Sequence, residues 1–174
     1  GYTLDGVQPD EFGPGDDKLT FRRALTPVER ARAADLDVVG ALLVAQLAEH
    51  GVSLDARRAQ EALAGLIHEP ARGAVLAARD GSATIGFAVL ATTWTVEHGG
   101  LVAWLDELYV VPPRRGAGVG QALLTRALAE ARALGCRAVE LEVDHEHARA
   151  EHLYGRNGFE PLSRARWVRS LVGP

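Results

Sequence analysis

The stretch from Leu105 to Gly120, LDELYVVPPRRGAGVG, combines residue types that could bind a phosphate. Glycines at 116, 118 and 120 carry no side chain, so an anion could approach the backbone closely. Apolar spacing predicts a helix from Gly118. The first amides of a helix lack partners within the helix, and the helix dipole adds partial positive charge there. The pattern therefore predicts a site for a diphosphate.

Neighbouring residues refine this prediction. Arg114 or Arg115 could add a charged contact. A Walker-type loop ends in Gly-Lys-Ser/Thr, whereas Gln121 and Ala122 follow Gly120 here. The Walker interpretation therefore fails. A dinucleotide fingerprint places G-x-G-x-x-G near the first strand, with an acid about 20 residues later. This stretch instead has G-x-G-x-G deep inside the chain, so it matches that fingerprint only weakly. A loop that only allows a helix and a strand to pack closely stays an alternative.

Two adjacent carboxylates, Asp106 and Glu107, precede the loop on a predicted strand. Either could act as a general base. Side chains alternate along a strand, so normally only one of the two faces a substrate. A β-bulge would change which one does. Plain solvated carboxylates are the alternative for both residues.

The hydropathy pattern predicts the elements that must position these residues. Strands are expected at 19–24, 73–78, 83–92, 101–111 and 136–143, from 159, and at 164–171, and helices at 33–50, 54–67, 118–134 and 145–156. The turn Arg79-Asp80-Gly81 predicts a β-hairpin. The strand, helix and strand around the glycine-rich loop predict a crossover unit with parallel strands. Residues 1–17, rich in Gly, Pro and Asp, are expected to form a flexible extension.

Composition limits the class of protein. The 174 residues are 47% hydrophobic and 24% charged, which is typical of one soluble globular domain, expected at 18–174. The net charge of −4, with Lys18 as the only lysine, predicts no nucleic-acid partner. No apolar run reaches the roughly 20 residues that cross a bilayer, and no secretory signal is recognisable, so no membrane association and a cytoplasmic location are expected.

The remaining reactive residues indicate no further chemistry. Cys136 is the only cysteine, so an intramolecular disulfide is excluded, and its setting predicts a buried, inert thiol. The histidines and acids from Asp144 to His147, with His152 beyond, lack H-E-x-x-H spacing. No metal site is therefore expected.

Two ordered motifs resemble the GNAT superfamily of N-acetyltransferases. Arg115 to Gly120 (RGAGVG) is similar to the family signature Gln/Arg-x-x-Gly-x-Gly/Ala. Ala148 to Phe159 (ARAEHLYGRNGF) is similar to Asn-x-x-Ala-x-x-Leu-Tyr-x-x-x-Gly-Phe. The resemblance, which includes element order from Leu19 to Leu171, implies a mixed α/β fold. It implies a splayed central sheet of six to seven strands with helices on both faces.

The resemblance implies acetyl-coenzyme A as cofactor. Its diphosphate would rest on the amides of Arg115 to Gly120, and its pantetheine arm would pair with the backbone around Leu108 to Val110. His147 stands where the family has asparagine, and histidine can also donate a hydrogen bond. The implied cofactor-binding residues are Leu108, Tyr109, Val110, Arg114, Arg115, Gly116, Ala117, Gly118, Val119, Gly120, Gln121 and His147.

The resemblance also implies catalytic roles. Tyr154 matches a tyrosine whose hydroxyl lies near the thioester sulfur in many members. Such a phenol, protonated at neutral pH, can protonate the leaving thiolate, and packing of its ring in the core is the alternative. WLDELYV is similar to the L-E-D-x-x-V stretch of diamine and polyamine acetyltransferases. That register places Asp106 at the base position, and a bulge would favour Glu107 instead.

The expected function is transfer of an acetyl group from acetyl-coenzyme A to a primary amine of a small molecule, by direct attack in a ternary complex. Acetylation of a protein or peptide, an aminoglycoside or an amino acid remains open. A non-catalytic acyl-coenzyme A-binding module also remains an alternative function. Assembly of the chain as a homodimer remains open as well.

Overall fold

The computed structural model describes residues 2–9, 13–14, 18–23, 26–143 and 148–171. The chain divides into two compact units, Gly1–Glu142 and Val143–Pro174. Each unit is described by itself below.

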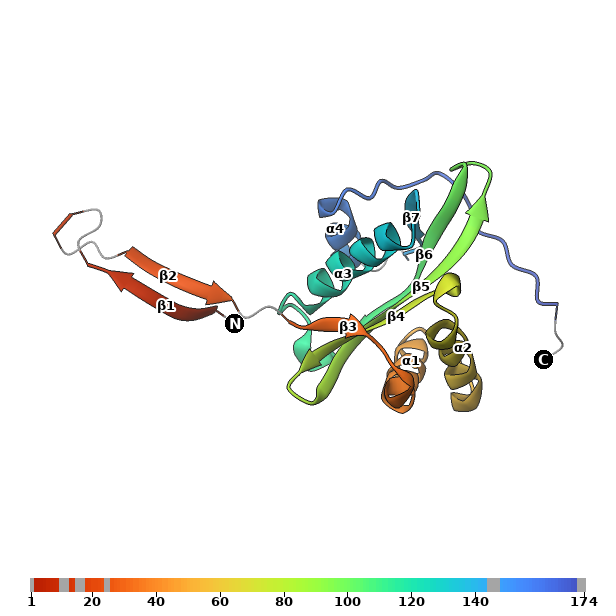
Figure 1. Cartoon of the computed structure of the whole chain (residues 1–174), viewed down its shortest axis with the longest axis horizontal. Coiled ribbons are helices and arrows are strands. Elements are labelled where there is room, and N and C mark those ends of the chain that lie inside the picture. Colours follow the sequence, from red (N-terminus) through yellow and green to blue (C-terminus); the bar gives the residue numbers. More distant parts are fainter. Residues whose placement is uncertain (1, 10–12, 15–17, 24–25, 144–147, 172–174) are drawn as a thin grey trace. The chain divides into compact units, whose positions relative to one another are not determined.

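A five-stranded sheet forms the framework of the first unit, in the order β3-β4-β5-β6-β7 (Figure 1). Its strands are β3 (Val28–Arg30), β4 (Gly73–Asp80), β5 (Ala83–Thr95), β6 (Gly100–Val110) and β7 (Ala138–Leu141). Neighbours from β3 to β6 are antiparallel, and β7 is parallel to β6. The predicted hairpin and parallel crossover are confirmed. The expected six to seven strands are wrong, because the described sheet has five.

Helices cover both faces of this sheet, as predicted. Helices α1 (Leu36–Glu49) and α2 (Ala56–His68) lie on one face, and α3 (Val119–Ala133) lies on the other (Figure 1). Helix α2 begins where the Asp55 side chain accepts a hydrogen bond from the Arg58 amide. On the α1–α2 face, apolar side chains of both helices pack with Phe87, Val89 and Tyr109 of the sheet. These contacts fix the position of α1 over β6.

The N-terminal residues contain structure that the sequence pattern did not predict. Strand β1 (Tyr2–Gln8) pairs antiparallel with β2 (Lys18–Arg23) in a separate two-stranded sheet. The predicted strand at 19–24 is therefore confirmed, but its described partner is β1 rather than the main sheet. Glycine and aspartate interrupt the apolar alternation of β1, and β3 spans only 3 residues, so neither gave a periodic signal.

The second unit contains helix α4 (Ala148–Arg156). The strands predicted from 159 and at 164–171 are wrong, since residues 157–171 form no strand. Arginines alternate with apolar residues there, but Trp167 and Val168 are 91% and 95% exposed. A strand needs a neighbour for its backbone groups, and no described segment pairs with this one.

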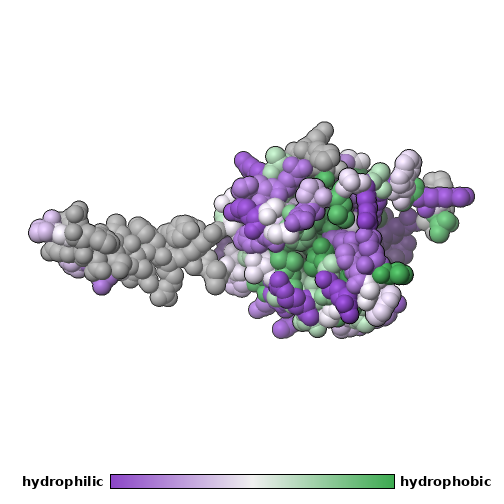
Figure 2. Space-filling view, turned by 90° about the horizontal axis from the view of Figure 1, so that it is seen from above, coloured by the Kyte–Doolittle hydropathy of each residue, from purple (hydrophilic) through white to green (hydrophobic). Residues whose placement is uncertain are grey.

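No helix in the described part of the chain is long and apolar enough to span a bilayer. Figure 2 shows hydrophilic residues over much of the visible surface.

Candidate active site

The loop between β6 and α3 has the geometry that its glycines predict. Strand β6 ends at Val110, a 3-10 turn follows at Pro112–Arg114, and α3 begins at Val119. Gly116 and Gly118 have φ angles of 78° and 85°, which other residues adopt at a cost. Gly118 is the N-cap of α3 and, as a glycine, supplies no side-chain hydrogen bond to cap the helix. The chain thus turns tightly into a helix whose N-cap residue has no side chain.

This loop fits a diphosphate. A Cβ atom built on Gly116 would meet no heavy atom within 4 Å, so the space beside it is open. The amides of Gly116, Gly118, Val119 and Gly120 donate no hydrogen bond to any residue that the structure describes. Amides at the start of a helix are natural donors to an anion.

Both predicted arginines are engaged elsewhere in this structure. Arg114 is ion-paired with Asp80. Arg115 donates from Nη2 to the Glu49 carboxylate at 2.7 and 3.0 Å, and from Nε to the Val110 carbonyl at 2.8 Å. The backbone amides and the helix dipole therefore supply the uncommitted positive potential here. A direct arginine–phosphate contact stays a prediction.

The Arg115–Glu49 pair also fastens the loop to α1. Tyr109, which is buried, donates from its hydroxyl to Glu49 at 2.8 Å. The Arg115 guanidinium lies 5.3 Å from the centre of the Tyr109 ring, which adds a cation–π contact. Hydrogen bonds from Arg115 and Tyr109 lower the pKa of the Glu49 carboxyl, so it stays charged.

The edge of β6 leading into the loop could accept an extended arm. The β7 strand pairs only with Val102 to Leu105, so Leu108 to Val110 have no strand neighbour on that side in the described residues. Their backbone groups on that edge suit the predicted pantetheine pairing. The other residues predicted to contact the cofactor lie further along the chain. Ala117 is in the loop, and Val119 to Gln121 form the first turn of α3.

A β-bulge separates the environments of the two carboxylates. Val89 lies opposite Glu107 and Leu90 opposite Leu105, so Asp106 has no partner on β5. Asp106 is exposed, whereas Glu107 is half-buried. The Glu107 carboxylate accepts a hydrogen bond from Gln46 Nε2 of α1 at 2.5 Å. The bulge therefore turns Glu107 toward the α1 face.

Burial is the main reason that the Glu107 carboxyl has an unusually high pKa. Burial, followed by the nearby charge of Asp106, raises the pKa of the Glu107 carboxyl to about 7. The hydrogen bond from Gln46 acts in the opposite direction and lowers this pKa. A carboxylate with a pKa near neutrality is well matched to general-base catalysis at that pH.

Tyr154 lies on α4 in the second unit. Its ring packs edge-on against Phe159, with centroids 5.6 Å apart. Its carbonyl accepts hydrogen bonds from the amides of Asn157 and Phe159. His147 lies outside the described residues, so its predicted cofactor contact stays a prediction.

Cys136 is half-buried, and burial raises the pKa of its thiol. The thiolate is therefore disfavoured, as the prediction of an inert residue requires. Among the described residues, which exclude Asp144 to His147, no group of histidine, cysteine and acidic side chains could hold a metal ion.

Sequence reasoning missed the two α1 residues that hold this site, Gln46 and Glu49. Gln46 follows Val39 and Leu43 at helical spacing, on the face that packs against the sheet. A polar residue in an apolar stripe is a signal that could have identified it.

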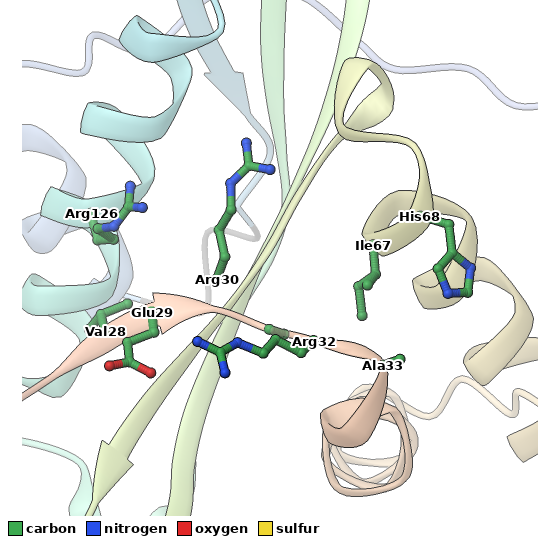
Figure 3. Close-up of a pocket in the computed structure, with 9 residues that line it drawn as sticks. Val28, Glu29, Arg30, Arg32, Ala33, Ile67, His68 and Arg126 are labelled. Atoms are coloured by element: carbon green, nitrogen blue, oxygen red, sulfur yellow. The ribbon is translucent and has the colours of Figure 1, made fainter.

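A cavity of about 620 Å³ lies elsewhere, around β3 (Figure 3). Arg126 reaches it from α3, and Ile67 and His68 reach it from α2. Arg30 and Arg126 both bind the buried carboxylate of Glu130. None of the residues predicted for catalysis or cofactor binding lines this cavity.

Residues 41–159 match the acetyltransferase (GNAT) family. One relative, an aminoalkylphosphonate N-acetyltransferase of Salmonella typhimurium, is 29% identical over 83% of this chain and 90% of its own length. A mycothiol acetyltransferase of Beutenbergia cavernae is 41% identical over 44% of this chain. The match spans only 26% of the length of that relative.

Solved structures share the fold. An integron cassette protein from a salt-marsh metagenome superimposes with a TM-score of 0.77 at 30% identity, over 87% of this chain and 95% of its own. The aminoglycoside N-acetyltransferase AAC(6')-Iy, solved in complex with coenzyme A, has a TM-score of 0.73 at 18% identity, over 87% of this chain and 98% of its own.

Proposed function

Since the chain belongs to the acetyltransferase (GNAT) family, we propose that it transfers an acetyl group to a primary amine of a small molecule. Family membership makes the chain an N-acetyltransferase domain that uses acetyl-coenzyme A. Beyond family membership, we propose the class of acceptor, the residue that acts as base, and direct attack of the amine on the thioester in a ternary complex. The observation that carries it is the half-buried Glu107, held on the strand that leads into the glycine-rich loop.

The loop and the strand edge bind the cofactor. The amides of Gly116 and Gly118 to Gly120 hold the diphosphate, because they are uncommitted and lie at the positive end of α3. The backbone of Leu108 to Val110 pairs with the pantetheine arm. When bound, acetyl-coenzyme A supplies the thioester that the amine attacks.

Glu107 takes the proton that keeps the acceptor amine inert. An alkylammonium has no lone pair, so it must lose one proton before its nitrogen can form a bond to the acetyl carbon. The pKa of Glu107, about 7, leaves a large fraction of its carboxyl ionised at neutral pH. Asp106, exposed at the bulge, adds a negative charge that attracts the cationic amine.

Tyr154 provides the proton that the leaving thiolate needs. A phenol hydroxyl can donate its proton to sulfur as the carbon–sulfur bond breaks. A backbone amide of β6 polarises the carbonyl of the acetyl group. These roles rest on the matching motif around Tyr154 and on the family.

Small cationic amines are the acceptor class that best suits this site. The carboxylates of Asp106 and Glu107 would attract such a molecule. The names of the relatives include an aminoalkylphosphonate and an aminoglycoside acetyltransferase, and both names indicate small amine acceptors. An aminoglycoside is therefore the second candidate.

A panel assay tests this proposal. Coenzyme A release is measured with alkyl diamines, polyamines, aminoalkylphosphonates, aminoglycosides, amino acids and peptides, and each product is identified by its added acetyl mass. We expect acetylation of one class of small primary amine. Calorimetric binding of coenzyme A without acetylation of any amine would instead indicate a binding module, and acetylated peptides alone would exclude the small-molecule class.

A further inference from the structure

We propose that Gln46 is a positioning residue that holds the carboxylate of Glu107 in place to accept the proton of the amine. This inference rests on the proposed function of Glu107 as the base. It extends the site to helix α1, which carries neither sequence motif.

The contact between the two side chains is short and sheltered. Gln46 is 8% exposed, and its Nε2 donates to Glu107 Oε2 at 2.5 Å. Gln46 shares the packed face of α1 with Val39 and Leu43, so neighbouring side chains restrict its rotation. A carboxylate that accepts a bond from a restricted donor is itself restricted to one orientation.

The other end of the Gln46 amide indicates that its role is not structural. Its Oε1 is buried and accepts no hydrogen bond from any described residue. A buried acceptor without a partner destabilises a fold, and an apolar side chain of similar size would avoid that cost. Gln46 is thus poorly suited to packing and well suited to donating to Glu107.

Helix α1 holds the cofactor loop as well. Glu49 follows Gln46 by three residues, so the two side chains lie on neighbouring positions of one helix face. Glu49 accepts from Tyr109 of β6 and from Arg115 of the loop. One rigid helix therefore sets the positions of both the base and the diphosphate loop.

Two variants test the role of Gln46, with a matched control. Gln46→Leu removes the donor and the unpartnered oxygen together, and Gln46→Glu replaces the donor with an acid. Gln60→Leu is the control, because Gln60 Nε2 also donates to a carboxylate, Asp37 Oδ1 at 3.0 Å, on the exposed surface. For each protein, kcat/KM is followed across pH with an amine that the wild type acetylates, and the Glu107 carboxyl is titrated by carbon NMR.

We expect Gln46→Leu to raise the midpoint of the acid limb, and of the Glu107 titration, by about one pH unit. The rate well above that midpoint should fall by no more than about tenfold, and coenzyme A affinity should not change. Gln46→Glu should shift both midpoints further upward, since a second carboxyl beside Glu107 disfavours its charge. The charge of Asp106, which also raises the pKa of Glu107, is the same in all variants.

An unmoved Glu107 titration in both variants would overturn the inference. So would equal loss of activity at every pH together with weaker coenzyme A binding, because a purely structural role predicts that result. Failure of the proposed base role looks different: the wild type would show no acid limb near the Glu107 midpoint, whereas the titration itself would still respond to Gln46→Leu.

Discussion

At the residue scale, Asp106 and Glu107 show how adjacent carboxylates acquire different chemistry. The bulge exposes Asp106 and turns Glu107 toward Gln46 on α1. Burial raises the pKa of Glu107 to about 7, and Asp106 contributes the second-largest effect. These different surroundings are the reason we propose Glu107 rather than Asp106 as the base.

We expect Glu107→Gln to lower kcat by about 10²- to 10⁴-fold, because the amide keeps the shape of the side chain and cannot accept the proton. Coenzyme A affinity, measured by calorimetry, should stay within about twofold of the wild type. Asp106→Asn is the matched control and should lower kcat far less. A larger loss in the control would reassign the base to Asp106.

The wild-type pH profile should have an acid limb. Glu107 acts as a base only when deprotonated, so kcat/KM should rise as the pH increases through about 7. Removing the charge of Asp106 in Asp106→Asn should move the midpoint to lower pH, because that charge raises the pKa of Glu107. A midpoint that does not move in this variant would contradict the electrostatic coupling.

We expect Tyr154→Phe to lower kcat by about 10- to 100-fold with little change in coenzyme A affinity, since it removes only the hydroxyl. The ring contact with Phe159 is retained in the variant. Phe159→Leu tests the packing alternative and should affect thermal stability more than kcat. No loss of kcat in Tyr154→Phe would leave packing as the role of Tyr154.

At the element scale, the loop between β6 and α3 depends on backbone conformation. Gly116 and Gly118 adopt left-handed φ angles, and Glu49 of α1 anchors the loop through Arg115. The start of α3 therefore has amides that donate to no described residue, and the space beside Gly116 is open.

A methyl group on the loop should harm binding beyond its effect on stability. Gly116→Ala should reduce the free energy of unfolding by about 1 kcal/mol, because its φ of 78° strains any residue with a side chain. No steric clash adds to this cost, since no heavy atom lies within 4 Å of the added carbon. Its coenzyme A dissociation constant should rise by about tenfold or more, since the methyl group would occupy space beside the diphosphate.

Gly81→Ala is the control for this prediction. Gly81 also has a positive φ, 57°, and open space, but it lies in the turn between β4 and β5. Urea denaturation should therefore show a similar loss in the free energy of unfolding, and calorimetry should show unchanged coenzyme A binding. Equal effects on binding would argue against a diphosphate at Gly116.

At the scale of the whole molecule, the small sheet β1–β2 shares no hydrogen-bonded ladder with the five-stranded sheet in the described part of the chain. The family match also begins after it, at residue 41. We therefore propose that the catalytic domain lies within the residues that follow β2.

Removing residues 1–25 should leave the main sheet intact. The thermal unfolding midpoint should change by less than about 3 °C, and coenzyme A affinity and kcat should be retained. The full chain is the control in each measurement. Loss of coenzyme A binding would show that the N-terminal segment contributes to the site.

Local sequence signals predicted most elements of the first unit. The Asp-Gly turn between β4 and β5 and the glycines before α3 are short-range features, and their backbone requirements depend on few neighbours. The apolar stripes of α1 and α3 predicted their buried faces in the same way. The prediction of strands after α4 was wrong. Alternation of apolar residues shows only that a segment could form a strand, and no described segment pairs with this one.

The sequence by itself therefore determined the α/β class, the glycine-rich loop before α3 and a pair of candidate bases. Only the tertiary structure gave those two carboxylates different surroundings and brought in Gln46 and Glu49, which lie 61 and 60 residues from their partners Glu107 and Tyr109. The physical reason is that burial and hydrogen bonding depend on which distant segments pack together. Sequence periodicity describes each segment alone, whereas the pKa of Glu107 and its contact with α1 arise from the assembled core.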